Sequence, residues 1–150
     1  MILRNYVFRD GGNIPPRYTC DGANVNPILV IESIPEEAKS LVLIVDDPDA
    51  TGGFIFTHWF LWNISPATTE IREGEAPEGA VQGKNDFGNE GYGGPCPPKG
   101  ARPHRYMFKL YALDTLLDIP RSSGKEKLEN AMEGHIVART TMMGLYARVI

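Results

Sequence analysis

Apolar residues occur along this sequence in short runs, separated by turns rich in glycine and proline. The clearest runs are SLVLIVDD (40–47), THWFLWNI (57–64) and RYMFKLYAL (105–113), each of strand length and rich in β-branched or aromatic residues. We predict that these three runs form the central strands of a sheet. Weaker segments of the same kind are YVF (6–8), PILVI (27–31) and MMGLYARVI (142–150). The pattern therefore predicts a mostly antiparallel β fold.

One segment, residues 124–133, has helical character instead. Its apolar face is formed by Leu128, Ala131 and Met132. Ser122 or Ser123 is placed to cap the first turn, and Gly134 is placed to end the helix. A second helix is hard to find, so the predicted class is mostly β with one or two short peripheral helices.

Residues 73–98 are broken by many glycines and prolines, and we interpret them as a long ordered loop. Loops of this length inside a compact domain are usually functional. The sequence shows no internal repeat, low-complexity tract or linker, and 150 residues are the size of one domain. We therefore expect a single domain over residues 1–150.

Charge and hydropathy exclude several classes of partner. Lys and Arg number 15 against 19 Asp and Glu, a net charge of −4, so no global positive field would attract nucleic acid. The longest apolar run, residues 41–45, is far too short to span a membrane, and the start MILRN lacks the apolar region of a signal peptide. We expect a cytoplasmic protein that binds no nucleic acid and does not insert into a membrane.

The two cysteines, Cys20 and Cys96, are too few for a disulfide scaffold and too far apart for a CxxC zinc site. Two reduced thiols are the favoured interpretation. A bridge between them is the alternative, because intracellular disulfides do occur in thermophiles.

Residues with chemical potential gather at two places where a predicted strand meets a loop. DDPDAT (46–51) ends one strand just before His58, and GPCPPKGARPHRY (94–106) delivers His104 and Tyr106 into another. Pro48 stiffens the turn that carries Asp47 and Asp49. A purely structural turn, with the carboxylates bound to local N–H groups, is the alternative for these aspartates. A single His or Tyr is usually structural as well, so it is the joint position that favours a site.

Five motifs, YTCDGANVNP, DDPDA, HWFLWN, NDFGNEGYGGPCPP and GARPHRY, occur in this order from about Tyr18 onward. In this the sequence resembles the phosphatidylethanolamine-binding protein family, and in particular its bacterial and archaeal Raf-kinase-inhibitor-like branch. The resemblance implies a sandwich of two antiparallel sheets. It also implies a small pocket near one end that accepts phosphate, acetate and phosphorylated head groups.

Carried over motif by motif, the resemblance also implies which residues form that site. The ligand-binding set would be Asp47, His58, Cys96, Pro97, His104 and Tyr106. Pro48 and Asp49 would hold the turn. Thr51 replaces a proline of the family pattern, and Phe54 and Phe56 stand where tryptophan or tyrosine is common, so either could form an apolar wall.

The leading functional hypothesis is a non-enzymatic binding module for a small anion or a phosphorylated ligand, which could dock a charged segment of a partner protein. Two other classes are a protease inhibitor or kinase-pathway regulator, and a hydrolase with or without a metal. The sequence ends at Ile150, where longer eukaryotic members continue, so we do not carry kinase inhibition over. HExxH, GxSxG and Walker motifs are absent, and we expect no cofactor and no metal. Relatives often pair, and we expect a homodimer.

An ionised Asp47 would repel an anion placed beside it. Three arrangements would relieve this repulsion: Asp47 keeps a proton, it pairs with a cationic histidine, or the ligand brings its own cation. Two histidines against one aspartate predict that acetate affinity rises as the pH falls from about 8 to about 6.

Overall fold

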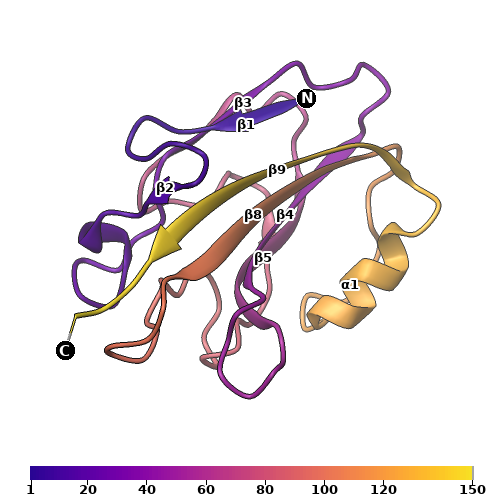
Figure 1. Cartoon of the computed structure of the whole chain (residues 1–150). Coiled ribbons are helices and arrows are strands. Elements are labelled where there is room, and N and C mark those ends of the chain that lie inside the picture. Colours follow the sequence, from indigo (N-terminus) through magenta and orange to yellow (C-terminus); the bar gives the residue numbers. More distant parts are fainter. Residues whose placement is uncertain (150) are drawn as a thin grey trace.

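Four long strands form the centre of the larger sheet (Figure 1). They are β4 (Ser40–Asp47), β5 (Phe56–Ile64), β8 (His104–Leu113) and β9 (Ile136–Tyr146). Two short strands, β2 (Gly12–Asn13) and β7 (Val81–Gln82), complete the spatial order β2-β9-β8-β4-β5-β7. All pairs in this sheet are antiparallel except β2 with β9. The three central strands predicted from the apolar runs are therefore present, within one residue of the expected bounds.

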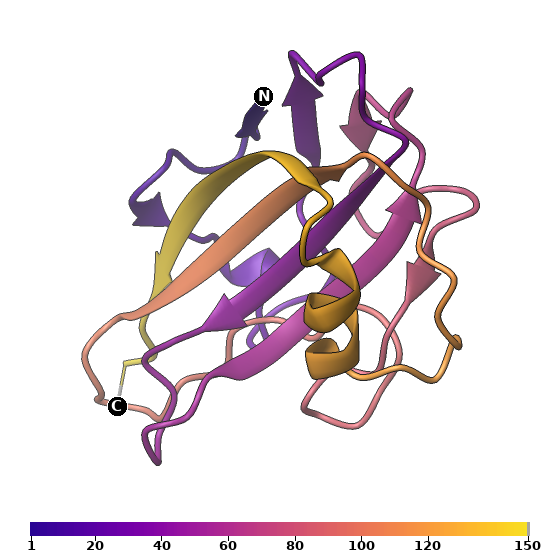
Figure 2. The same ribbon diagram turned by 90° about the vertical axis from the view of Figure 1, so that its right-hand side faces the viewer.

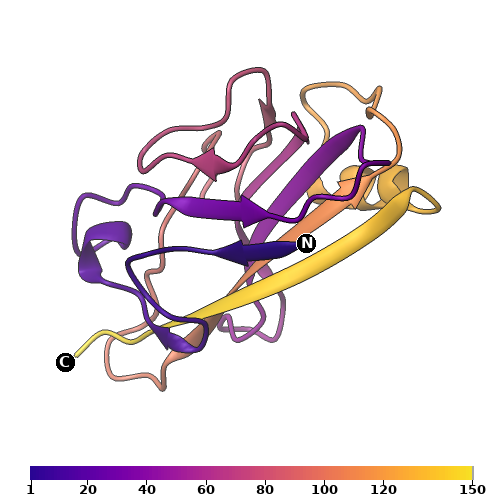
Figure 3. The same cartoon turned by 90° about the horizontal axis from the view of Figure 1, so that it is seen from above.

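A smaller antiparallel sheet and one α-helix cover the two faces of the larger sheet. The smaller sheet has the order β1 (Ile2–Arg4), β3 (Leu29–Glu32) and β6 (Glu70–Ile71). It lies over one face (Figure 3), and α1 (Lys125–Met132) lies across the opposite face, over β4 and β5 (Figure 2). A 3₁₀ turn, η1 (Pro16–Tyr18), follows β2. The mostly β, antiparallel sandwich predicted from the sequence is confirmed.

Strand β4 is buried along its whole length because both of its faces are covered. Leu41, Leu43 and Val45 belong to the core between the two sheets. Val42 and Ile44 belong to a second core between the larger sheet and α1. Side chains alternate between the faces of a strand, so a continuous apolar run is what a strand with two covered faces requires.

The prediction of a strand at residues 6–8 is wrong. The first strand is β1 (Ile2–Arg4), and the chain turns directly after it. The Asn5 side-chain oxygen accepts the backbone N–H groups of Val7 and Phe8, both at 2.8 Å, which closes the turn. An Asn side chain that binds its own backbone in this way competes with a strand ladder.

Two other expected boundaries also differ. Strand β9 begins at Ile136, six residues before the expected start at Met142, because its first half is half-exposed and therefore lacks a strong apolar signal. The last residue of that predicted strand, Ile150, lies outside residues 1–149, which are the part the computed structural model describes. Helix α1 follows Gly124 and has no side-chain cap, since the Ser123 hydroxyl donates to the Pro120 carbonyl instead.

The expectation of two reduced thiols is also wrong. Cys20 and Cys96 form a disulfide that joins segments 76 residues apart. Both cysteines sit on loops, and the Cys20 backbone N–H donates to the Pro95 carbonyl oxygen at 3.1 Å, which holds the segment after η1 against the loop before β8. Among residues 1–149, no helix has the length and apolar character needed to cross a membrane.

Candidate functional site

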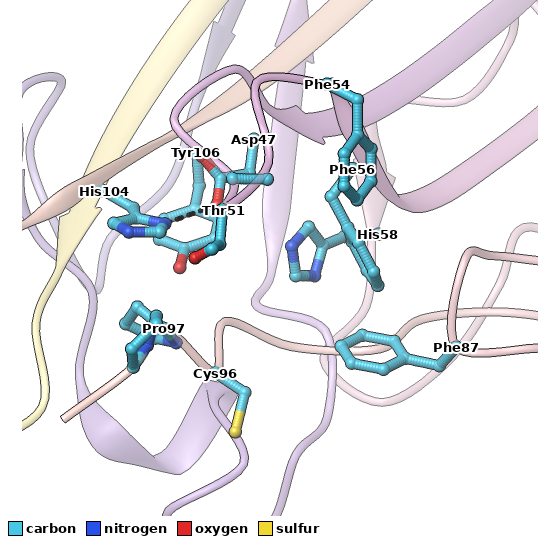
Figure 4. A pocket seen from close by; sticks show the side chains of 12 residues that line it. Asp47, Thr51, Phe54, Phe56, His58, Phe87, Cys96, Pro97, His104 and Tyr106 are labelled. Carbon is cyan, nitrogen blue, oxygen red and sulfur yellow. Dashed lines mark hydrogen bonds and ion pairs between the residues drawn. The ribbon is translucent and has the colours of Figure 1, made fainter. Parts of the chain in front are cut away.

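A pocket of about 260 Å³ opens where β4 ends and where β5 and β8 begin (Figure 4). Its lining consists of Asp47, Ala50, Thr51, Phe54, Phe56, His58, Phe87, Cys96, Pro97, Pro98, His104 and Tyr106. All six residues expected to bind a ligand lie in this lining. The two predicted clusters, about fifty residues apart in sequence, therefore meet in space.

Strand pairing brings three of the polar side chains together. The register between β4 and β8 ends with Asp46 paired to Met107, and Asp47 and Tyr106 are the next residues of these two strands. His104 lies two residues before Tyr106 in β8 and therefore on the same face. Tyr106 is 1% exposed, and it continues the row of core residues on this face of the strand.

His58 reaches the pocket through an irregularity in β5. Val45 pairs with Trp59 and Asp46 pairs with Thr57, so His58 is an extra residue between two paired positions, as in a β-bulge. A bulge breaks the alternation of side chains and re-aims one of them. The His58 ring consequently packs edge-on against the Tyr106 ring, with 5.2 Å between ring centroids.

Asp47 is held by two donors. Its Oδ1 accepts the Asp49 backbone N–H at 2.7 Å, and its Oδ2 accepts from His104 Nδ1 at 2.7 Å (Figure 4). The first bond is the contact with a local N–H group that is expected if Asp47 only stabilises the turn. The second bond joins Asp47 to His104 in the pocket lining. The same carboxylate therefore stabilises the turn and takes part in the candidate site.

Asp49 fixes the turn from the outside. Its carboxylate accepts from Nε and Nη2 of Arg105, at 2.9 and 2.8 Å, and from the Arg105 backbone N–H at 2.9 Å. These bonds with Arg105 lower the pKa of Asp49 from 3.8 to about 2. Asp49 and the exposed Pro48 thus join the end of β4 to the start of β8 and do not line the cavity.

Burial dominates the acid–base behaviour of the two remaining polar groups. It lowers the pKa of His58, although the Gly93 carbonyl and nearby carboxylates act in the opposite direction. Burial also raises the pKa of Tyr106, so that its hydroxyl keeps its proton. From the sequence we expect acetate affinity to rise between about pH 8 and pH 6, as the histidines become charged. Because the pKa of His58 is lowered, the part of this rise that depends on a charged His58 is expected at lower pH.

The loop before β8 forms the opposite wall through Cys96 and Pro97. Gly94 is needed here, because a Cβ at this position would lie 2.4 Å from the Tyr18 carbonyl oxygen and 2.5 Å from Asn24 Oδ1. The Gly94 N–H donates to Asn24 Oδ1 at 2.8 Å. The disulfide from Cys96 to the segment after η1 adds a covalent tie. Glycine thus serves close packing of this loop on the N-terminal segment.

Aromatic rings form the remaining side of the pocket. The Phe56 ring lies 4.8 Å from His58 and 4.7 Å from Phe87, measured between centroids. Phe54 and Phe87 are 54% and 47% exposed, so the rim of the pocket is apolar. Phe87 was missed by sequence reasoning, and its place in the NDFGN part of the long loop was the available signal.

Within the described chain, no group of three His, Cys, Asp or Glu side chains is placed to hold a metal ion. The polar groups of the pocket are suited to hydrogen bonding: an imidazole paired with a carboxylate, a second imidazole and a phenol. Such groups can orient a small oxyanion.

A family model described as phosphatidylethanolamine-binding protein matches residues 4–147. The chain belongs to the phosphatidylethanolamine-binding protein family. The match begins well before Tyr18, where the resemblance of the sequence motifs started. A UPF0098 protein from Methanothermobacter thermautotrophicus is 50% identical to this family member, over 99% of each chain.

Two solved structures of the same family superpose closely on this chain. A phosphatidylethanolamine-binding protein homologue from Chlamydia trachomatis has a TM-score of 0.91 at 42% identity, covering 97% of this chain and 96% of its own. Escherichia coli YbcL, described as a member of the mammalian family, has a TM-score of 0.89 at 32% identity, with the same coverage. Relatives therefore occur in both archaea and bacteria, as the sequence motifs indicated.

Proposed function

We propose that this protein is a non-catalytic binding module for small phosphorylated or carboxylated ligands, either free or carried by a segment of a partner protein. One observation carries the proposal. Asp47, His58, His104 and Tyr106 converge from three strands on one pocket of about 260 Å³. This volume suits a small anionic group with a modest apolar attachment.

The pocket is organised before a ligand arrives. His58 is held by the Gly93 carbonyl, His104 is held by Asp47, and Tyr106 is packed in the core. Ordering flexible side chains costs binding free energy, so groups that are already fixed retain more of each contact.

The charges in the pocket support an anionic guest. Asp47 accepts hydrogen bonds from His104 and from the Asp49 backbone N–H, and a cationic His104 would offset its charge. The Tyr106 hydroxyl keeps its proton and can donate it in a hydrogen bond. Hydrogen bonds to charged groups contribute about 1.5–3 kcal/mol each.

The lining also supports binding without turnover. The sulfur of Cys96 is engaged in the disulfide and is no free nucleophile. Among the described residues, no serine lines the pocket, and Thr51 and Tyr106 supply its side-chain hydroxyls. The cytoplasmic location and the homodimer expected from the sequence stay predictions.

Calorimetric titration with inorganic phosphate, acetate and phosphoethanolamine tests the proposal. We expect at least one of them to bind with one site per chain, and Tyr106→Phe to weaken it by about 10- to 100-fold because one charge-assisted hydrogen bond is lost. Tyr111→Phe is the matched control, since Tyr111 lies on the same strand but packs against the core under α1. Absence of binding by the unsubstituted protein would contradict the proposal, and turnover of phosphate or carboxylate esters would contradict its non-catalytic part.

A further inference from the structure

The hydrogen bond between His58 and Gly93 fixes which nitrogen of His58 carries the proton. Nδ1 lies 2.7 Å from the Gly93 carbonyl oxygen. A carbonyl oxygen only accepts, so Nδ1 must be the N–H group. A neutral imidazole has one such group, and Nε2 of His58 is then a bare acceptor.

The acceptor nitrogen faces the pocket. In Figure 4 one ring nitrogen of His58 is directed towards the space between Tyr106 and Cys96. Within residues 1–149, the Gly93 carbonyl is the hydrogen-bond partner of this ring, and no protein donor reaches Nε2. Among the described residues, the fully buried side-chain polar atoms without a hydrogen-bond partner are Glu32 Oε1 and Asp46 Oδ1. Nε2 of His58 is not one of them, so it remains accessible from the pocket.

The carboxylate of Asp47 is already engaged by two donors. Both oxygens of Asp47 take hydrogen bonds, one from Asp49 N–H and one from His104 Nδ1. The Tyr106 hydroxyl is a donor. The pocket therefore offers the hydroxyls of Thr51 and Tyr106 as donors, and His58 Nε2 presents an acceptor to the ligand oxygen that meets it.

We propose that His58 Nε2 is a specificity determinant that accepts a hydrogen bond from a protonated oxygen of the ligand. The pocket then selects hydrogen phosphate, or a monoprotonated phosphomonoester, over sulfate and other oxyanions that carry no proton. This inference rests on the function proposed above and narrows its ligand class. A ligand oxygen without a proton would place lone pair against lone pair in a buried site.

The neutral state of His58 has a structural cause. The ring is 3% exposed and lies among Phe56, Phe87 and Tyr106. Carboxylates face it from two elements, Asp46 and Asp47 at the end of β4 and Asp86 in the long loop, and each favours the charged ring. Burial outweighs them, so the pKa of His58 is lowered.

The test compares phosphate with sulfate by calorimetry at about pH 7.5, where both are mainly dianions but only phosphate retains a proton. We expect phosphate to bind about tenfold or more tightly, because the unmatched acceptor opposes sulfate. His58→Asn places an amide N–H at the position of Nδ1, preserving the bond to Gly93, and removes Nε2. We expect the phosphate-to-sulfate ratio to fall to within about twofold in this variant. His135→Asn is the control, since His135 is exposed and bound to Asp114 outside the pocket.

Nitrogen-15 NMR of the unsubstituted protein reads the tautomer directly and does not depend on whether His58→Asn folds. We expect the proton of His58 on Nδ1. A proton on Nε2, or equal binding of phosphate and sulfate, overturns the inference while the proposed anion-binding function stands. Failure of phosphate, sulfate, phosphomonoesters and acetate to bind overturns the proposed function and this inference with it.

Discussion

His104 Nδ1 lies 2.7 Å from Asp47 Oδ2, and the two side chains are 10% and 5% exposed. This contact is the geometry that one of the three arrangements requires, in which Asp47 pairs with a cationic histidine. Removing one partner of a buried pair costs far more than removing both, because the remaining group is left without compensation.

Replacing His104 should therefore weaken ligand binding, because the buried Asp47 carboxylate loses its hydrogen-bond donor. We expect His104→Ala to weaken phosphate binding at least about tenfold and to lower the free energy of unfolding by about 3–5 kcal/mol. Replacing both residues, His104→Ala with Asp47→Asn, should recover part of both losses, as calorimetry and urea unfolding would show. His135→Ala serves as the control for loss of an exposed imidazole. A double variant no better than the single one would contradict charge pairing as the cause.

The turn after β4 should have its own acid dependence. The folded-state pKa of Asp49 is lowered to about 2 by Arg105, below its ordinary value of 3.8. The stability that the ionised carboxylate contributes is therefore complete above about pH 4 and is lost as the pH falls towards 2. Asp49→Asn should flatten this part of the curve of melting temperature against pH. Arg105→Lys should flatten it partly, since a lysine keeps the charge but not the paired geometry. An unchanged acid limb in Asp49→Asn would contradict this account.

The disulfide should stabilise both the fold and the pocket wall. It closes a loop of 76 residues, so we expect Cys20→Ser with Cys96→Ser to lower the free energy of unfolding by about 2–4 kcal/mol. Phosphate affinity should also fall, because binding would then have to order the segment around Cys96 and Pro97. Urea unfolding and calorimetry with and without a reducing agent measure both effects. The double variant should not respond to the reductant, whereas the unsubstituted protein should; a reductant-insensitive unsubstituted protein would contradict the role of the bridge.

Local sequence signals sufficed for the central strands of the fold. The runs that became β4 and β5 contain unbroken apolar stretches, residues 41–45 and 59–62, because both faces of the sheet are covered there. The run that became β8 alternates instead between buried positions and half-buried or exposed ones over most of its length. The short first strand was misplaced because the side chain of Asn5 redirects the chain, and no periodicity reports such a bond. The family motifs then indicated which polar residues meet.

What the sequence could not supply is the geometry between those residues. The bulge that turns His58 towards Tyr106 arises from a mismatch in register between two strands, which depends on both of them. The Cys20–Cys96 bond depends on how the loop before β8 lies on the N-terminal segment. Phe87 enters the pocket from a loop whose course is set by contacts far from it in sequence.

The acceptor role of His58 predicts how many protons the complex takes up when a phosphomonoester binds. A phosphomonoester has its second pKa near 6, so at about pH 7.5 methyl phosphate arrives mainly as a dianion without a proton. The complex should hold one proton between the ligand and Nε2, so binding should take up about one proton. Affinity should then fall about tenfold for each pH unit between about 7 and 8. Calorimetry in two buffers of different ionisation enthalpy measures the uptake directly, and His58→Asn should reduce it to near zero. Tight binding of methyl phosphate without proton uptake would show that a donor, and not an acceptor, meets the ligand at this position.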